Sequence, residues 1–224
     1  MCSSDLIAPT AVFVADGVPL GMTDIDAQYY MVPEIEAAID AMVTAYPTLA
    51  RKVDLSALPG GQLTIGGRHI YALKVSDNVA VDEDEPAILL AAQHHAREVN
   101  APHMVIGAMQ RVLNGYATDV QLQALVNGRE LYFVPMVNPD GVDYVWSTNN
   151  LWRKNRRNNG GGVFGVDNNR NYPTLWGLCG ASTVTSNETY RGPSAGSEAE
   201  TVTMRNAVAL LRPEIYLDFH SYGQ

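Results

Sequence analysis

The sequence has few cysteines, little positive charge and no long hydrophobic run. Two cysteines among 224 residues are too few for a disulfide framework, so the fold must rest on a hydrophobic core. No stretch reaches the roughly 18 consecutive apolar residues of a membrane span. A net charge of -9 argues against a nucleic-acid partner, because phosphate binding needs a surplus of Lys and Arg. With 46% hydrophobic and 17% charged residues, the composition is typical of one soluble globular domain.

The N-terminal residues also lack the basic segment and apolar run of a secretory signal. The segment from Cys2 to Leu6 can be back-translated to TGC TCT TCC GAT CT, which is similar to the tail of a common sequencing adapter. We therefore expect residues 1–6 to be non-native. The encoded domain is then expected to occupy residues 7–224.

Hydrophobic periodicity predicts an alternation of strands and helices. Helices are predicted over 33–46, 100–114, about 118–127 and 197–211; strands over 86–92, 130–137 and 214–219; and a hairpin around Gly66-Gly67 within 62–76. Ser197 and Glu200 have capping-box spacing at the last helix. Residues 138–196 are expected to form a long loop that is functional or disordered. The pattern predicts an α/β domain with a mixed, largely parallel central sheet flanked by helices.

Polar side chains directly follow three of the predicted strands. They are the segments 94–98, 138–141 and 220–222. In open α/β sheets, ligands bind beyond the carboxyl ends of the strands. If these strands run parallel, the three segments meet at one edge of the sheet.

His95 and Glu98 have H-x-x-E spacing, so both side chains can reach the same point if the chain turns there. Imidazole and carboxylate suit Zn²⁺, and two His plus one Glu is a known catalytic zinc ligand set. His220 is the candidate third ligand, and we expect His94 to be a neighbour of the ligands. Taken alone, H-x-x-E is also compatible with a solvated helix start.

Six motifs occur in one order along most of the chain. They are HAREV (95–99), NPDG (138–141), LWRKNR (151–156), GVDNNRNY (165–172), ETYRGPSAGSEAE (188–200) and FHSYGQ (219–224). In these motifs the sequence resembles the zinc carboxypeptidase family, especially its bacterial carboxypeptidase T-like branch. The resemblance extends from about residue 28 to the end of the chain.

The resemblance implies a role for each matched residue. It implies one Zn²⁺ held by His95, Glu98 and His220; Arg153 polarising the scissile carbonyl; Asn169 and Arg170 gripping the terminal carboxylate; Arg97, Ser221 and Tyr222 lining outer subsites; and Asp167 orienting a zinc-bound histidine. A guanidinium suits the carboxylate-binding role because its planar donors match a carboxylate bidentately.

The implied activity is hydrolysis of the C-terminal peptide bond of peptides or proteins by metal-activated water. The resemblance further implies a secreted monomer, with no nucleic-acid or membrane partner. Two alternatives stay open. One is a zinc amide hydrolase acting on small acylated amino acids; the other is an inactive fragment that binds zinc and C-termini.

The sequence departs from the family pattern in two places. Asn150 stands where many members have arginine. Because an amide carries no charge, we expect secondary binding of the substrate carboxylate to be weaker. The family's general-base glutamate, mobile tyrosine and specificity-pocket floor belong to a region that would follow Gln224. We therefore expect a partial catalytic domain, truncated at its C-terminus, inactive as given and poorly soluble.

Overall fold

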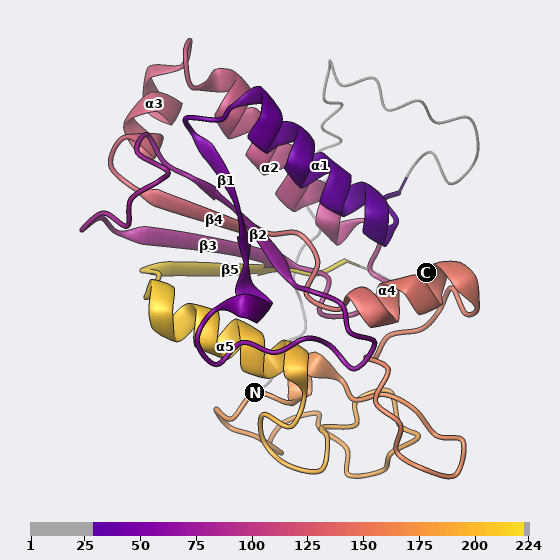
Figure 1. The fold of residues 1–224 in the computed structure, drawn as a ribbon. Coiled ribbons are helices and arrows are strands. Elements are labelled where there is room, and N and C mark those ends of the chain that lie inside the picture. The colour runs from indigo at the N-terminus through magenta and orange to yellow at the C-terminus, as the bar shows by residue number, and fades with distance from the viewer. Residues whose placement is uncertain (1–28, 222–224) are drawn as a thin grey trace.

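The computed structural model describes residues 29–221 (Figure 1). Residues 1–6 and Tyr222, on which two of the expectations above depend, lie outside this range. The elements are α1 (Val32–Ala45), β1 (Ala50–Asp54), η2 (Leu55–Ala57), β2 (Tyr71–Val75), β3 (Ala87–Ala92), α2 (Ala101–Gly115), α3 (Val120–Val126), β4 (Glu130–Val134), α4 (Pro139–Ser147), η3 (Asn168–Arg170), α5 (Ala199–Leu211) and β5 (Ile215–Phe219). Among these, no helix combines the length and apolar character needed to cross a bilayer.

The strands form one mixed sheet in the order β1-β2-β4-β3-β5. The pairs β1–β2 and β2–β4 are antiparallel, whereas β4–β3 and β3–β5 are parallel. Helices flank this sheet, so the predicted fold class is confirmed. Because β3, β4 and β5 run in the same direction, their carboxyl ends meet at one edge of the sheet.

Helices cover both faces of the sheet, with α1 and α2 on one face and α5 on the other (Figure 1). The side chains of β4 alternate between these faces. Leu131 and Phe133 belong to the core beneath α1 and α2, whereas Tyr132 and Val134 belong to the core beneath α5. All four are buried. A strand buried on both faces needs apolar side chains throughout, which explains the continuous apolar run in its sequence.

The predicted hairpin over residues 62–76 is wrong. Only Tyr71–Val75 forms a strand there, and it pairs with β4 and with β1, a strand that the sequence pattern did not reveal. Asp140 anchors the preceding loop from a distance. Its carboxylate accepts a hydrogen bond from the Gly66 backbone N–H at 2.7 Å and pairs with Arg68 at 2.8 Å. These long-range contacts replace the local strand pairing that the glycine turn suggested.

The segment 138–196 is not one continuous loop, because it contains α4 (Pro139–Ser147). Asn138 caps this helix by accepting a hydrogen bond from the Gly141 backbone N–H at 3.0 Å. Pro139 follows in the first turn, where its missing N–H has no cost. The NPDG motif is therefore a helix start, and α4 brings Asn138 to the carboxyl edge of the sheet.

The predicted capping box at α5 is also wrong. The helix begins at Ala199 with Glu198 as its N-cap residue, and no side chain caps it. Ser197 Oγ donates to Glu198 Oε1 at 2.6 Å instead. Glu200 is buried and accepts a hydrogen bond from Asn155 at 3.2 Å. Ser197 Oγ also accepts from Asn171 Nδ2 at 2.9 Å, so long-range contacts engage both side chains that the capping box would need.

Candidate metal centre

The candidate ligands follow two parallel strands that lie side by side. Ala92 at the end of β3 is opposite Phe219 at the end of β5, so the residues after each strand emerge as neighbours. Gln93 then has a φ of 61°, which is uncommon for a residue other than glycine and recurs at functional sites. This turn ends β3 and directs the following segment along the edge of the sheet.

The three predicted metal ligands converge on one point. Glu98 Oε1 lies 2.8 Å from His95 Nδ1, and Glu98 Oε2 lies 2.8 Å from His220 Nδ1. One ligand atom from each residue lies within 4.8 Å of the others. His95 and Glu98 belong to a turn closed by a 3.2 Å backbone hydrogen bond between them, and α2 begins only at Ala101. The H-x-x-E spacing therefore acts through a turn and not through a helix.

Carboxylates hold the outer nitrogen of both histidines. His95 Nε2 lies 3.0 Å from Asp167 Oδ1, and His220 Nε2 lies 2.9 Å from Asp218 Oδ2. Metal-binding histidines usually donate their second N–H to a carboxylate, a carbonyl or water, which fixes the tautomer and the ring orientation. Both rings thus present Nδ1 towards Glu98 in the way that a shared metal ion would require.

The charges of the cluster are strongly coupled. Burial alone would raise the pKa of Glu98, but hydrogen bonds from His220 and His95 outweigh burial and lower the pKa to about 2. Burial alone would lower the pKa of His220, whereas its bonds to Asp218 and Glu98 raise the pKa to about 10. A proton and a metal ion compete for His220 Nδ1, so metal binding must release this proton.

Arg153 lies beside the same cluster. Its Nε and Nη2 atoms donate to Asp167 Oδ2 at 3.2 and 2.9 Å, while Nη1 lies 4.0 Å from Glu98 Oε1. Its backbone oxygen accepts a hydrogen bond from the Ala96 N–H at 2.9 Å. Two of its nitrogens are therefore tied to Asp167, and Nη1 remains directed towards the region of the cluster.

Asn169 and Arg170 follow Asp167 in η3. Asn169 Nδ2 lies 3.3 Å from His220 Nε2, which places this amide at the cluster. Arg170 lines a neighbouring pocket together with Asn169, Tyr172, Leu175, Trp176 and Leu178. Its Nη1 donates to the Asn169 backbone oxygen at 3.0 Å. The two residues thus connect the histidine cluster with a pocket that has a cation in its wall.

The remaining predicted site residues lie further out. Arg97 pairs with the exposed Glu188 at 3.4 Å. The Ser221 backbone N–H donates to Glu98 Oε2 at 3.2 Å, and its buried Oγ has no hydrogen-bond partner among the described residues. Tyr222 is outside those residues, so its predicted place at an outer subsite stays a prediction.

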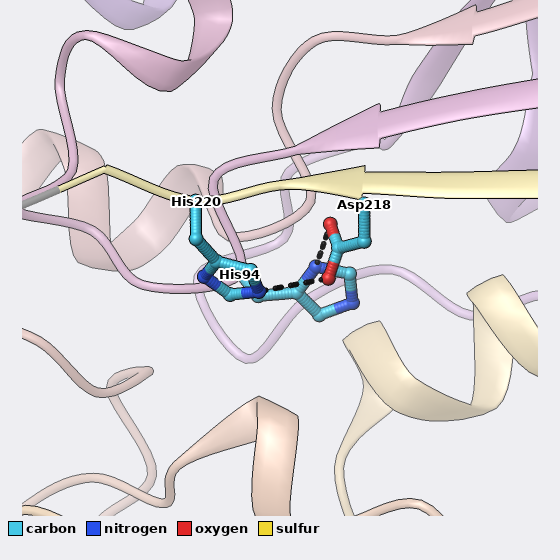
Figure 2. A group of neighbouring side chains, drawn as sticks. All are labelled: His94, Asp218 and His220. Atoms are coloured by element: carbon cyan, nitrogen blue, oxygen red, sulfur yellow. Dashed lines mark hydrogen bonds and ion pairs between the residues drawn. The ribbon is translucent and has the colours of Figure 1, made fainter. Parts of the chain in front are cut away.

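The sequence pattern did not single out Asp218, Tyr172 or a contact of His94. His94 Nδ1 lies 3.0 Å from Asp218 Oδ1, and His94 Nε2 lies 2.7 Å from the Tyr172 hydroxyl. Figure 2 shows the Asp218 carboxylate bonded to the rings of both His94 and His220. The available signal was the period of β5, since Asp218 is two residues before His220 and lies on the same side of the strand.

Asn138 joins the segments that carry these groups. Its Nδ2 donates to the backbone oxygens of His94 at 3.1 Å and Lys154 at 3.2 Å, while its Oδ1 caps α4. The amide is fully buried. It therefore connects the segment after β3 with the loop that carries Arg153.

Two clusters of metal-ligand type share His220. One comprises His95, Glu98 and His220; the other comprises His94, Asp218 and His220. The first offers two Nδ1 atoms facing both oxygens of one buried carboxylate, and it is the two-histidine, one-glutamate set known for catalytic zinc. In the second, Asp218 hydrogen-bonds two rings in the same way, but its side chain is 21% exposed against 7% for Glu98, and its carboxylate is an aspartate. The donor set of the first cluster therefore fits zinc better.

A two-histidine, one-glutamate cluster at the carboxyl edge of a mixed α/β sheet is an arrangement of ligands suited to one zinc ion. A family model described as zinc carboxypeptidase matches residues 35–224. The chain belongs to the zinc carboxypeptidase family, which uses one Zn²⁺.

Similar proteins agree with this membership. The zinc carboxypeptidase of Saccharothrix mutabilis subsp. capreolus is 39% identical over 154 residues, which cover 68% of this chain and 34% of that protein. Carboxypeptidase B of Astacus astacus is 34% identical over 200 residues, which cover 88% of this chain and 62% of that protein. The crystal structure of carboxypeptidase A from Helicoverpa armigera superposes with a TM-score of 0.76 at 28% identity, covering 87% of this chain and 46% of that chain. The chain thus spans between one third and just under two thirds of these relatives.

Proposed function

We propose that His95, Glu98 and His220 hold a zinc ion in a protein that removes C-terminal residues from peptides. The observation that carries this proposal is the pairing of each Glu98 oxygen with a different histidine Nδ1 at 2.8 Å. The outer nitrogens of both rings are held by carboxylates, which leaves the Nδ1 atoms for a metal. When bound, zinc supplies Lewis-acid chemistry and lowers the pKa of a coordinated water to about 7.

Arg153 is proposed to bind the oxygen of the scissile carbonyl. Nε and Nη2 of its guanidinium donate to Asp167. Nη1 is then the nitrogen that can donate to a substrate oxygen at the cluster. A donor placed where negative charge develops typically lowers a barrier by about 2.7–4 kcal/mol. The hydrogen bond from the Ala96 N–H to the Arg153 backbone oxygen holds the Arg153 backbone next to His95.

Asn169 and Arg170 are proposed to bind the free carboxylate of the substrate. Asn169 lies next to His220, and Arg170 lies in the wall of the adjoining pocket. A guanidinium and an amide beside the metal ligands would select a C-terminal bond over an internal one, because only the C-terminal residue carries a free main-chain carboxylate. Arg97, Ser221 and Tyr222 are proposed to contact residues further along the peptide.

Hydrolysis also needs a base that accepts a proton from water. Within residues 29–221, each carboxylate that contacts the cluster is already paired: Glu98 with both ligand histidines, Asp167 with His95 and Arg153, and Asp218 with His94 and His220. We assign the base to none of them. The proposal of catalysis accordingly concerns the whole protein, while the proposals of zinc and carboxylate binding concern the chain itself.

The function is tested with the natural full-length protein loaded with zinc. Its rate is measured on a blocked dipeptide with a free carboxyl end, on the same dipeptide with an amidated end, and on an N-acyl amino acid. The proposal predicts rapid cleavage of the first and at least about 100-fold slower cleavage of the second, since the carboxylate contacts are lost. Faster cleavage of the amidated dipeptide would contradict it. A clear preference for the N-acyl amino acid would favour the zinc amide hydrolase.

A binding role without catalysis is the second candidate. It is favoured for the 224-residue chain because, within residues 29–221, every carboxylate at the cluster is already paired and none is assigned as the base. Calorimetry with the zinc-loaded 224-residue chain tests this role. Binding of an acyl amino acid but not of its amide, without turnover, would establish it. Loss of that discrimination in Arg170→Lys would assign the selectivity to the guanidinium.

We also propose that the whole protein acts outside the cell as a monomer on peptide or protein C-termini. The family resemblance supports this proposal. Detecting the protein in the culture medium of its source, and measuring its mass in solution, are the direct tests. A cell-retained or oligomeric natural protein would contradict it.

A further inference from the structure

We propose that Tyr172, His94 and Asp218 form a hydrogen-bonded chain that positions His220 for metal binding. This inference rests on the proposed role of His220 as a zinc ligand. It assigns a positioning role to three residues that lie around the ligand cluster without belonging to it. None of the three needs to touch the metal or the substrate.

The contacts run in one unbroken line. The Tyr172 hydroxyl lies 2.7 Å from His94 Nε2, His94 Nδ1 lies 3.0 Å from Asp218 Oδ1, and Asp218 Oδ2 lies 2.9 Å from His220 Nε2. Figure 2 shows the last two contacts, with the Asp218 carboxylate bonded to both rings. The line begins at the segment after η3, passes through the turn after β3 and β5 itself, and ends at the residue that follows β5.

One arrangement of protons satisfies all three contacts of the line. In it, the Tyr172 hydroxyl donates to His94 Nε2, and His94 Nδ1–H donates to Asp218. The second oxygen of Asp218 then accepts from His220 Nε2–H, so His220 Nδ1, which faces Glu98, is the nitrogen available to a metal once its proton is released. His94 is only 1% exposed, so water cannot readily take the place of either partner.

The two candidate ligand histidines are supported in parallel ways. Asp167 orients His95 and is itself fixed through its other oxygen by Arg153. Asp218 orients His220 and is itself fixed through its other oxygen by His94. His94 therefore has the place at one ligand that Arg153 has at the other, but without lying next to Glu98.

The adjacent alternative is a metal ion bound directly between His94, Asp218 and His220, whose ligand atoms lie within 4.8 Å of one another. Such an ion would occupy His220 Nε2 and remove Asp218 from its orienting place. It would also replace the His94 Nδ1 proton. The two accounts therefore predict opposite states for His94 Nδ1, which carries a proton in the first and a metal in the second.

The test compares zinc affinity and the visible spectrum of the cobalt-substituted protein among variants of the 224-residue chain. His94→Leu removes both hydrogen bonds, whereas His94→Asn keeps a donor near the position of Nδ1. His69→Leu is the matched control. His69 Nδ1 lies 2.7 Å from Asp54 Oδ2, a similar pair that does not belong to the cluster. Tyr172→Phe is a milder variant that removes only the first contact of the chain.

We expect His94→Leu to lower zinc affinity by about 10–100-fold, as loss of outer support at a metal site usually does, and to change the cobalt spectrum. His94→Asn should recover most of the zinc affinity and of the cobalt spectrum. Tyr172→Phe should shift the affinity and the spectrum slightly in the same direction as His94→Leu. His69→Leu should change neither the affinity nor the spectrum. Wild-type affinity and spectrum in a folded His94→Leu would overturn the inference. Equal loss in His94→Asn and His94→Leu would overturn it as well.

Nitrogen-15 NMR of the histidine rings in the metal-free protein tests the inference without any metal. A proton on His94 Nδ1 that is lost or moved in Asp218→Asn supports the chain of contacts, and an unprotonated Nδ1 contradicts it. A wild-type protein that takes up no zinc would sink the proposed function, while these ring signals would still decide whether the chain of contacts exists. A zinc-induced loss of the His94 Nδ1 proton would favour the adjacent metal site.

Discussion

Glu98 and His220 lie 122 positions apart in the sequence, yet Glu98 Oε2 and His220 Nδ1 are 2.8 Å apart in the structure. The contact exists only because β5 pairs in parallel with β3 and places Phe219 opposite Ala92. Assembly of the candidate metal centre is therefore coupled to formation of the sheet edge. Zinc that binds only the assembled cluster should in turn stabilise the fold.

Removing one candidate ligand tests the zinc set. His95→Ala should lower zinc affinity by more than about 100-fold, because losing a ligand costs more than losing its outer support. Equilibrium dialysis against zinc, with metal content measured by mass spectrometry, gives the affinity. His69→Ala is the control, since His69 is a partly exposed histidine that pairs with Asp54 elsewhere. Unchanged zinc content in His95→Ala would remove this residue from the set.

Asp167 is expected to act on both affinity and stability. It is fully buried between His95 and Arg153, and its contacts with these two residues oppose the effect of burial and lower its pKa to about 2. Asp167→Asn should weaken zinc binding by about 10–100-fold. It should also lower the free energy of unfolding by roughly 3–5 kcal/mol, because Arg153 loses its buried partner. Urea unfolding of the metal-free protein measures the effect on stability, and zinc titration measures the effect on affinity. Asp54→Asn is the control: it affects the pair with His69 and should change zinc affinity little.

The buried carboxyl of Glu200 predicts a pH dependence of stability. Complete burial raises its pKa to about 7, with the charge of Glu198 adding to this and the hydrogen bond from Asn155 opposing it. The group therefore binds its proton more tightly in the folded than in the unfolded chain. Its contribution to stability is full below the unfolded value near 4.5 and is lost as the pH rises through about 7.

The matched variant is Glu200→Gln, which keeps the shape and cannot ionise. Its free energy of unfolding should fall less than that of the wild type between pH 4.5 and 7, with a difference of a few kcal/mol. Urea unfolding across this pH range, on metal-free protein, gives the comparison. Parallel curves for the two proteins would contradict the assigned protonation of Glu200.

The edge strand β5 should cause self-association. Ile215, Tyr216 and Leu217 are 48%, 40% and 48% exposed, and within residues 29–221 the strand pairs only with β3. Unpaired strand edges with apolar side chains are templates for pairing between chains. We expect the 224-residue chain to associate at micromolar concentration and Leu217→Lys to reduce this association. Light scattering measures the mass; Val120→Lys, at an equally apolar site with 79% exposure in α3, should not reduce it.

The parts of the fold that were predictable from the sequence are those with a strong local pattern. β3 and β4 are buried on both faces and therefore read as apolar runs, and α2 has a regular helical period. β1 was missed because its sequence ARKVD buries only Ala50. α4 was missed because Asn138-Pro139 has the same local signal at a turn and at a helix start.

The ligand cluster was predictable because its residue types are chemically specific and follow strand ends. Its supporting contacts were less accessible. Asp218 and His94 are 124 positions apart in sequence, and nothing local indicates that they meet. The same holds for the contacts of the Asn138 Nδ2 group with the backbone oxygens of His94 and Lys154, which lie on separate segments. Such contacts depend on the strand order, which the local patterns of a sequence do not reveal.

The most direct test of the account is the position of the metal in crystals of the zinc-loaded protein, located by anomalous scattering at the zinc edge. The account predicts one zinc ion bound to His95 Nδ1, Glu98 and His220 Nδ1, with Zn–N distances of about 2.0–2.1 Å. Zinc bound instead to His94, Asp218 and His220 Nε2, or absent from both clusters, would contradict it.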